Sequence, residues 1–253
     1  MAQYSNGYIV GFAAAVCTVC GLFVSSAAVS LKEKQQENAL FDLQKNIVSV
    51  SGLSNPSEEL TKDKIAQLFD PKSANRVEEG FVDLESGAEV SKDKRADAKA
   101  DSTCLALKDN PAQIKCLPKY AKLYTIYQAD KADRFIIEVE GKGLWSTMKG
   151  FLAIASNGND VLGITFYSHG ETPGLGGEID NPNWKKKWEK LKAFDGSGNP
   201  QITVTKGAIT DDTKQIASLS GATLTSNGVD KLAKFWLSDK GYGKFLKSQG
   251  GKK

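Results

Sequence analysis

The hydrophobic pattern of this chain opens with one long apolar stretch. Residues 8–31 carry no charged side chain and consist mostly of Ala, Val, Cys, Phe and Gly. A helix needs about 20 apolar residues to span a bilayer, so this stretch predicts a membrane-spanning helix. A cleaved signal peptide is the alternative, but such a peptide normally begins with a basic region, and no Lys or Arg precedes Lys32. The pattern therefore favours a retained anchor.

Helical periodicity continues beyond the apolar stretch. Four apolar residues recur at helical spacing, so the spanning helix continues or restarts as an amphipathic one: Leu40, Leu43, Ile47 and Val48. A second helix is expected with Ser57 as its N-cap and four apolar residues on one side: Leu60, Ile65, Leu68 and Phe69. Residues 91–101 contain no large apolar side chain and predict an exposed helix or loop.

Apolar runs in the second half of the chain predict an antiparallel sheet. The expected strands are residues 123–127, 135–139, 151–155, 161–167 and 202–205. A polar turn at residues 130–133 separates the first two strands, and Asn157-Gly158 separates the next two. Asn-Gly is a strong hairpin signal because both turn positions favour positive φ. We therefore expect an antiparallel meander with both faces covered.

Two further helices are expected near the C-terminus. The first covers residues 183–194, carries Trp184 and Trp188, and exposes the lysines between them. The last ends near Gly241 and has five packed apolar residues: Val229, Leu232, Ala233, Phe235 and Trp236. The predicted class is α+β, with one sheet, helices packed on it and one anchor. The expected divisions are an anchor (1–31), a helical and polar connecting region (32–119), a domain core (120–245) and a flexible tail (246–253).

Charge and cysteines narrow the classes of function. Lys and Arg total 33 against 30 for Asp and Glu, a net charge of +3 that is too balanced to indicate a nucleic-acid partner. Cys17 and Cys20 lie one helical turn apart, as soft packing residues or as a ligand pair for a metal or cluster. Cys104 and Cys116 enclose a mostly polar loop and could pair in an oxidising compartment or remain reduced. With one histidine in the chain, no metal site is predicted.

The sequence SGAT at residues 220–223 is the first candidate site. Gly221 and Ala222 have almost no side chain, so another macromolecule could approach Thr223 closely. Helix signals begin near Ser226, and free N–H groups at a helix start suit a phosphate. From these residues alone, Thr223 could bind a phosphate, be esterified to one, or cap an ordinary strand-to-helix turn.

The sequence ETPGLGG at residues 171–177 is the second candidate. Three glycines and a proline form a tight loop whose main-chain groups can lie against a planar ligand. Leu175 supplies most of its apolar bulk. An ordinary turn is the alternative interpretation. His169, which borders the loop, is interpreted as a turn residue rather than a catalyst.

Together, SGAT, the ETPGLG loop and the anchor resemble the NqrC family, the third subunit of the bacterial Na+-translocating NADH:quinone reductase. The resemblance covers most of residues 1–245, is densest from Gly141 to Leu237, and is weakest at residues 88–119. It implies FMN as the cofactor, joined by a phosphoester to the threonine that matches Thr223. A flavin transferase that uses FAD and a divalent metal makes this bond in the family. Thr225 is not the attachment point on this alignment.

The resemblance also implies residues around the flavin. The matching loop lines the flavin pocket, and GLWS at residues 143–146 supplies an aromatic side chain that walls the flavin or fills the core. Lys206 could place a cation near the flavin phosphate or ring carbonyl, or could simply be a solvated strand end. No catalytic residue and no metal ligand is expected. The expected cofactor-binding residues are Thr223, Ser220, Gly221, Ala222, Trp145, Glu171, Thr172, Gly174, Leu175 and Lys206.

The resemblance implies a redox subunit of a Na+-pumping translocase. Its expected partners are the other membrane subunits, the flavin transferase and the membrane itself. NADH is not expected to bind this chain, which lacks a dinucleotide fingerprint. The family implies the bacterial inner membrane, with the main domain on the periplasmic side. Lys32 and Lys34 count against that orientation because basic residues tend to stay in the cytoplasm.

Two alternatives remain open. The RnfG family of the Rnf-type ferredoxin:NAD reductase shares both motifs, although GLWS and the NPNW sequence at residues 181–184 favour NqrC. The other alternative is a membrane-anchored flavin sensor or docking module. Flavin on Thr223 would exclude a purely structural module, and electron flow in membranes supplied with NADH would distinguish a carrier from a sensor.

Overall fold

The computed structural model describes residues 5–53, 60–107 and 109–250 and divides into two compact units, Met1–Leu43 and Gln44–Lys253. Its helices are α1 (Asn6–Ser51), α2 (Lys62–Leu68), η1 (Lys92–Lys94), α3 (Arg95–Ala100), η2 (Gly176–Asp180), α4 (Pro182–Lys186), η3 (Lys187–Lys190), α5 (Thr223–Leu237) and α6 (Gly243–Gln249). Its strands are β1 (Arg76–Asp83), β2 (Cys104–Leu105), β3 (Leu117–Pro118), β4 (Tyr120–Gln128), β5 (Lys131–Lys142), β6 (Thr147–Ala155), β7 (Val161–Ser168), β8 (Thr203–Thr205) and β9 (Gln215–Ala217).

The N-terminal helix is continuous. α1 runs for 46 residues and is long and apolar enough to cross a membrane. Of the two expectations for residues beyond 31, continuation and restart, the structure has continuation. The last turns of α1 bury Ile47, Val48 and Val50 in the second unit. The helix therefore changes from apolar on all sides to apolar on one side, as a change from lipid to protein surroundings requires.

The main sheet has five antiparallel strands in the order β1-β4-β5-β6-β7. The expected meander of four strands is confirmed. β1 was not expected, because Glu78, Glu79 and Gly80 interrupt its apolar residues. Its pairing with β4 places part of the expected connecting region within the same sheet as the domain core.

Both hairpin turns use backbone with positive φ. Ala129 and Asp130 have φ of 48° and 61° and join β4 directly to β5, so the expected turn at residues 130–133 is shorter than predicted. Gly158 has φ of 71°, as its hairpin signal predicts. The Asn157 side-chain oxygen accepts the N–H of Asn159 at 2.9 Å and thereby orders the rest of this loop.

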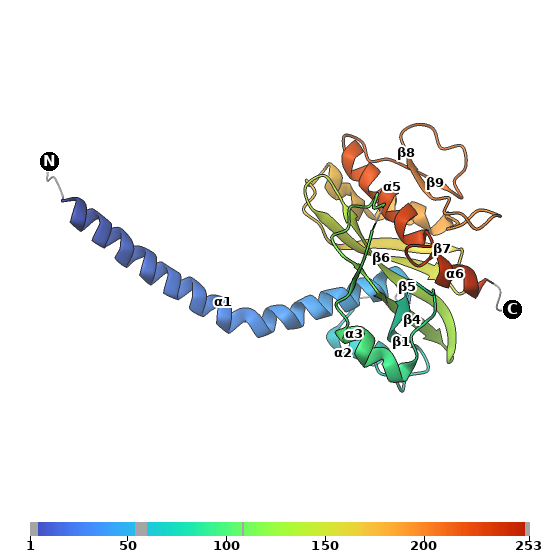
Figure 1. Ribbon diagram of the computed structural model, residues 1–253, viewed down its shortest axis with the longest axis horizontal. Helices are drawn as coiled ribbons and strands as arrows, with labels where there is room; N and C mark the ends of the chain where they lie inside the picture. Colours follow the sequence, from blue (N-terminus) through green and yellow to red (C-terminus); the bar gives the residue numbers. More distant parts are fainter. Residues whose placement is uncertain (1–4, 54–59, 108, 251–253) are drawn as a thin grey trace. The chain divides into compact units, whose positions relative to one another are not determined.

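Helices cover both faces of the sheet (Figure 1). On one face lie α5 and α6, where Phe135 of β5 packs edge-on against Phe245 with ring centroids 5.2 Å apart. On the other face lies the end of α1, where the Thr165 hydroxyl donates to Asn46 Oδ1 at 3.2 Å. This arrangement confirms the expected covering of both faces.

Three expectations for the helices differ from the structure. The helix expected at residues 183–194 is α4 followed by η3 and ends at Lys190, because the Leu191 carbonyl then accepts the N–H of Val161 at 2.9 Å and draws the chain back to β7. The tail expected from residue 246 begins too early, because α6 runs to Gln249 and fully buries Leu246. The expected Ser57 cap lies outside the described residues, and Thr61 caps α2.

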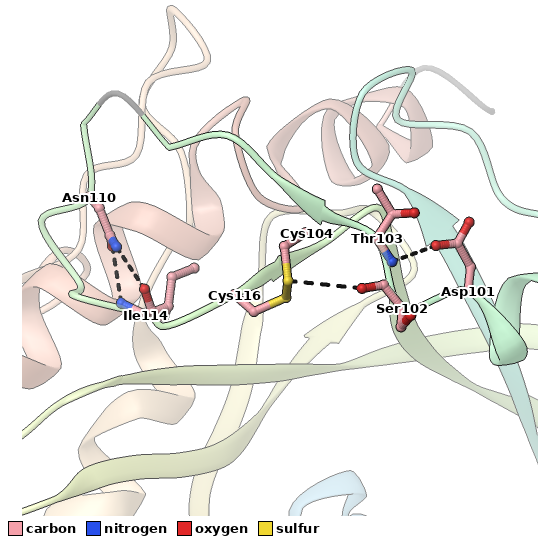
Figure 2. Close-up of a disulfide and its surroundings, with 7 residues drawn as sticks. All are labelled: Asp101, Ser102, Thr103, Cys104, Asn110, Ile114 and Cys116. Carbon is pink, nitrogen blue, oxygen red and sulfur yellow. Dashed lines mark hydrogen bonds between the residues drawn. A yellow bond between two sulfur atoms is a disulfide. The ribbon is translucent and has the colours of Figure 1, made fainter.

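A disulfide closes the polar loop beside the sheet. Cys104 and Cys116 are bonded, with Cα atoms 5.2 Å apart (Figure 2). Inside the loop, the Asn110 side chain donates to the carbonyl of Ile114 at 2.8 Å. The chain entropy removed by closing a loop of this size is worth about 3 kcal/mol. The loop also supports the end of β5, because the Ala112 carbonyl accepts the N–H of Lys142 at 2.8 Å.

Candidate functional site

Three loops meet at one end of the main sheet. GLWS joins β5 to β6, ETPGLGG follows β7, and SGAT leads into α5. The first two are joined where the Ser146 hydroxyl oxygen accepts the N–H of Gly170 at 2.6 Å. The last two touch, since a Cβ atom on Gly221 would lie 3.1 Å from Leu175 Cδ2. The structure therefore brings the three sequence motifs together.

Glu171 connects all three loops from the inside. Its side chain is 5% exposed, and its Oε1 atom accepts the N–H of Trp145 at 3.0 Å. Its Oε2 atom accepts the N–H of Leu144 at 3.2 Å and also the hydroxyl of Thr225. The carboxylate was expected to contact the ligand, whereas in the structure it is directed toward these protein groups.

The Glu171 carboxyl is stabilised in its charged form. Burial alone would raise its pKa, but the hydrogen bonds from Thr225, Trp145 and Leu144 outweigh burial and hold the pKa below its ordinary value of 4.5. Because the pKa is lowered in the folded state, the stabilisation is present above that ordinary value. It is lost as the pH falls through the lowered pKa.

Two glycines make room for this carboxylate. A Cβ atom on Gly143 would lie 2.4 Å from Glu171 Oε1, and one on Gly176 would lie 2.6 Å from Thr225 Oγ1. Neither space can hold a side chain without moving the hydrogen-bonded groups. The glycines of both loops are therefore required by close packing at these two positions.

His169 orders the start of the second loop. Its Nδ1 atom accepts the N–H of Glu171 at 3.2 Å, which assigns the ring proton to Nε2. That nitrogen lies 2.7 Å from Asp180 Oδ2. The ring thus spans the loop, in agreement with its interpretation as a turn residue.

α5 begins at Thr223, three residues before the expected start. Its first backbone bond runs from Ser226 N–H to Ala222 O at 3.0 Å, so the N–H groups of Thr223, Leu224 and Thr225 have no carbonyl partner within the helix. Ala222 occupies the N-cap position and makes no side-chain cap bond. The helix thus presents uncapped donors and the positive end of its dipole, which suit an anion.

The two threonines of this first turn face different surroundings. Thr223 is exposed, whereas Thr225 is 1% exposed and bonded to Glu171. Ser220 and Gly221 are also exposed, and Gly221 has φ of 71°. The exposed hydroxyl of Thr223 therefore lies beside a backbone segment with little side-chain cover.

Apolar side chains surround this helix start. Trp145 is 66% exposed and Leu175 is 47% exposed. Trp145 therefore does not fill the core, which was one of its two interpretations. Large exposed apolar side chains around a concentration of polar groups are typical of a ligand surface.

The remaining predicted residues lie in the same region. The Thr172 carbonyl accepts the N–H groups of Leu175 at 3.1 Å and Gly177 at 2.9 Å, which makes the loop a tight turn, with Gly174 at φ of 75°. Lys206 is exposed and directly follows β8, whose last residue, Thr205, accepts the N–H of Ser218 at 2.9 Å. Lys206 is thus near the segment that leads into SGAT.

Sequence reasoning did not identify the bond from Thr225 to Glu171. Fifty-four positions separate the two residues, and nothing in either motif marks them as partners. Two glycines that leave space around an acidic residue were the available signal. Within the described residues, no group of three or more His, Cys, Asp or Glu could hold a metal ion.

Comparisons with known proteins assign the family. Residues 143–238, from the GLWS turn to the end of α5, match the family model of the FMN-binding domain. The NqrC subunit of the Na+-translocating NADH-quinone reductase of Yersinia pestis is 41% identical over 92% of this chain and 88% of its own length. The NqrC subunit of Pseudomonas aeruginosa is 40% identical over 91% of both chains.

Solved structures share the fold. The crystal structure of NqrC from Shewanella oneidensis has a TM-score of 0.70 at 24% identity and covers 82% of this chain and 96% of its own. The crystal structure of the corresponding subunit from Parabacteroides distasonis has a TM-score of 0.62, also at 24% identity, and covers 85% of this chain and 96% of its own. With two fifths of the sequence identical over nearly its full length, the chain belongs to the NqrC family of Na+-translocating NADH-quinone reductase subunits.

Proposed function

We propose that this chain is the electron-transfer subunit that carries FMN on Thr223 through a phosphoester, within a Na+-translocating NADH-quinone reductase. One observation carries the proposal. Thr223 is an exposed hydroxyl at the first position of an uncapped helix, and the glycine loop and Trp145 lie beside it. The family supports NqrC over RnfG, because the relatives are NADH-quinone reductase subunits.

The residues present fit FMN. The free N–H groups at the start of α5 suit its phosphate, and Lys206 supplies a cation nearby. The exposed side chains of Trp145 and Leu175 offer apolar surface for a planar ring. The tight backbone of residues 172–177 offers polar groups for the ring edge. Each part of the cofactor thus has matching groups in the chain.

The protein holds the cofactor, and the cofactor supplies the redox chemistry. Bound FMN supplies the transfer of electrons singly or in pairs. Thr223 serves as a tether, which prevents loss of the cofactor, rather than as a catalyst. The small residues Gly221 and Ala222 leave room for a flavin transferase at the tether.

Attachment is a group transfer from FAD to the threonine. The Thr223 oxygen forms a bond to the phosphorus on the FMN side of FAD, and the pyrophosphate bond breaks. AMP leaves, and the hydroxyl proton passes to a base of the transferase or to solvent. The reaction needs an exposed hydroxyl, which Thr223 provides.

In-gel flavin fluorescence tests the proposal. Coexpression of the full chain with a flavin transferase should give a fluorescent band under ultraviolet light after denaturing electrophoresis, because only a covalent flavin survives denaturation. The chain expressed without the transferase is the control and should be dark. A dark band in the presence of a transferase that labels another NqrC protein would contradict the proposal.

We also propose a membrane topology with the N-terminus in the cytoplasm and the domain on the periplasmic side. The apolar helix and the disulfide support it, because disulfides persist in oxidising compartments. Lys32 and Lys34 oppose it. Alkaline phosphatase fused after Lys253 is expected to be active, and a cytoplasmic reporter at the same point inactive. The reverse pair of activities would overturn this orientation.

A charge in the glycine loop should disturb the flavin and leave the fold intact. Leu175 is 47% exposed, so Leu175→Glu is expected to retain the far-ultraviolet circular dichroism of the domain. Its carboxylate would lie against the proposed flavin ring and shift the absorption spectrum and the reduction potential. Ile209→Glu, which changes an exposed apolar residue of similar size in another loop, is the matched control. Unchanged spectra and potential in folded Leu175→Glu would exclude Leu175 from the pocket wall.

A further inference from the structure

The rotation of the first turn of α5 decides which threonine faces outward. Each residue turns an α-helix by about 100°, so side chains two positions apart differ by about 200° and lie on opposite sides. Thr225 is directed inward, 1% exposed, and Thr223 is exposed. A group that holds Thr225 inward therefore also holds Thr223 outward.

The hydroxyl of Thr225 makes this inward connection. It donates to Glu171, which lies on the glycine loop, whereas the neighbouring Ser226 accepts the N–H of Leu219 from its own segment. Glu171 in turn accepts the N–H groups of Leu144 and Trp145. One buried carboxylate thus connects the helix that carries the tether to both loops that flank it.

We propose that Glu171 and Thr225 are positioning residues for flavin attachment: their buried hydrogen bond fixes the first turn of α5 so that the Thr223 hydroxyl faces outward beside Leu175 and Trp145. The proposal rests on the proposed function, because it assumes that Thr223 receives FMN. It assigns to Glu171 a role through protein contacts rather than through contact with the cofactor.

The chemistry of the carboxylate explains why glutamate suits this position. It accepts one hydroxyl and two backbone N–H groups and donates to none of them. In Glu171→Gln, one oxygen becomes an NH₂ group that must face either Thr225 or a backbone N–H. One of the three hydrogen bonds is then reversed or lost, with almost no change in side-chain volume.

Attachment rates test the positioning role. In purified full-length protein with flavin transferase and FAD, Thr225→Val should slow the initial rate of FMN attachment by about 10-fold or more, since small displacements of a reacting group cost large factors. Thr225→Ser keeps the hydroxyl and should attach FMN at nearly the wild-type rate. Glu171→Gln should also be slow. If Thr225→Val does not fold, Glu171→Gln decides the matter by the same comparison.

A control variant separates positioning from general stability. Val229 is fully buried on α5, so Val229→Ala should weaken the packing of the helix and leave the bond from Thr225 to Glu171 in place. It should attach FMN at nearly the wild-type rate even where its melting temperature matches that of Thr225→Val. Equal slowing in Val229→Ala would reduce the role of Thr225 to stability and overturn the proposal.

Amide hydrogen exchange gives a readout that needs no flavin. In the chain without cofactor, Thr225→Val should speed exchange at the N–H groups of Leu144 and Trp145, because the freed carboxylate no longer holds them as firmly. A wild-type chain that never accepts FMN would overturn the proposed function and this proposal with it. Equal attachment rates and equal flavin spectra in the wild type, Thr225→Val and Glu171→Gln would overturn only the positioning role.

Discussion

Thr223→Val is expected to abolish the in-gel flavin fluorescence of this chain while leaving the domain folded. Valine has nearly the volume of threonine and lacks the oxygen that forms the phosphoester. Thr223 is exposed at the first position of α5, so the change removes no buried contact. Circular dichroism and the melting temperature should match the wild type within the small effects typical of surface substitutions.

Thr225→Val is the matched control for this result. Its fluorescence should persist at reduced yield, because Thr223 remains the acceptor and only its positioning is disturbed. Mass spectrometry of the peptide should place the FMN phosphate on Thr223. The Thr225 hydroxyl is buried and already bonded to Glu171, so a transferase could not reach it without opening the site. A phosphate found on Thr225 would refute the assignment even though the family is correct.

Much of the fold follows from local patterns in the sequence. The uncharged stretch, the four meander strands and the final helix depend on periodicity and turn residues, which are local properties. β1 escaped prediction because its polar residues are satisfied by tertiary contacts. Arg76 Nε donates to Glu78 Oε1 at 2.9 Å, and a second contact comes from Arg95 in α3 at 3.5 Å. No pattern within the strand reveals these partners.

The start of α5 shows a similar limit. Ser226 resembles an N-cap, because serine at a helix start normally accepts a backbone N–H two or three residues later. In the structure its hydroxyl oxygen accepts the N–H of Leu219, seven residues earlier. The helix can therefore begin at Thr223, where local propensity gives no signal. The folding of the preceding segment onto the helix overrides the local preference.

The candidate site was predictable in its motifs and not in its internal contacts. SGAT, GLWS and the glycine loop were expected near one ligand, and the structure brings them together. The direction of the Glu171 side chain was not predictable, because it depends on the space left by Gly143 and Gly176 and on a hydroxyl 54 residues away. Such contacts exist only once the sheet and α5 have packed.

Gly228→Ala is expected to destabilise the domain, although helix propensity alone predicts the opposite. Alanine within a helix is favoured over glycine by about 1 kcal/mol. A Cβ atom on Gly228 would, however, lie 2.4 Å from the carbonyl oxygen of Lys142, a backbone atom that cannot rotate away. Overpacking costs about 1–3 kcal/mol, and contact with backbone favours the upper end. The net loss in the free energy of unfolding should be about 2 kcal/mol.

Urea denaturation of the domain measures this loss, and Gly196→Ala is the control. A Cβ atom on Gly196 would meet nothing within 4 Å, so that variant should stay within about 0.5 kcal/mol of the wild type. Lys142 leads directly into the GLWS turn, so the clash at Gly228 should also displace Trp145 and lower the yield of FMN attachment. A Gly228→Ala variant as stable as the wild type, with full attachment, would show that α5 can move away from β5 at no cost. The close approach of helix and strand would then not be what sets the geometry of the site.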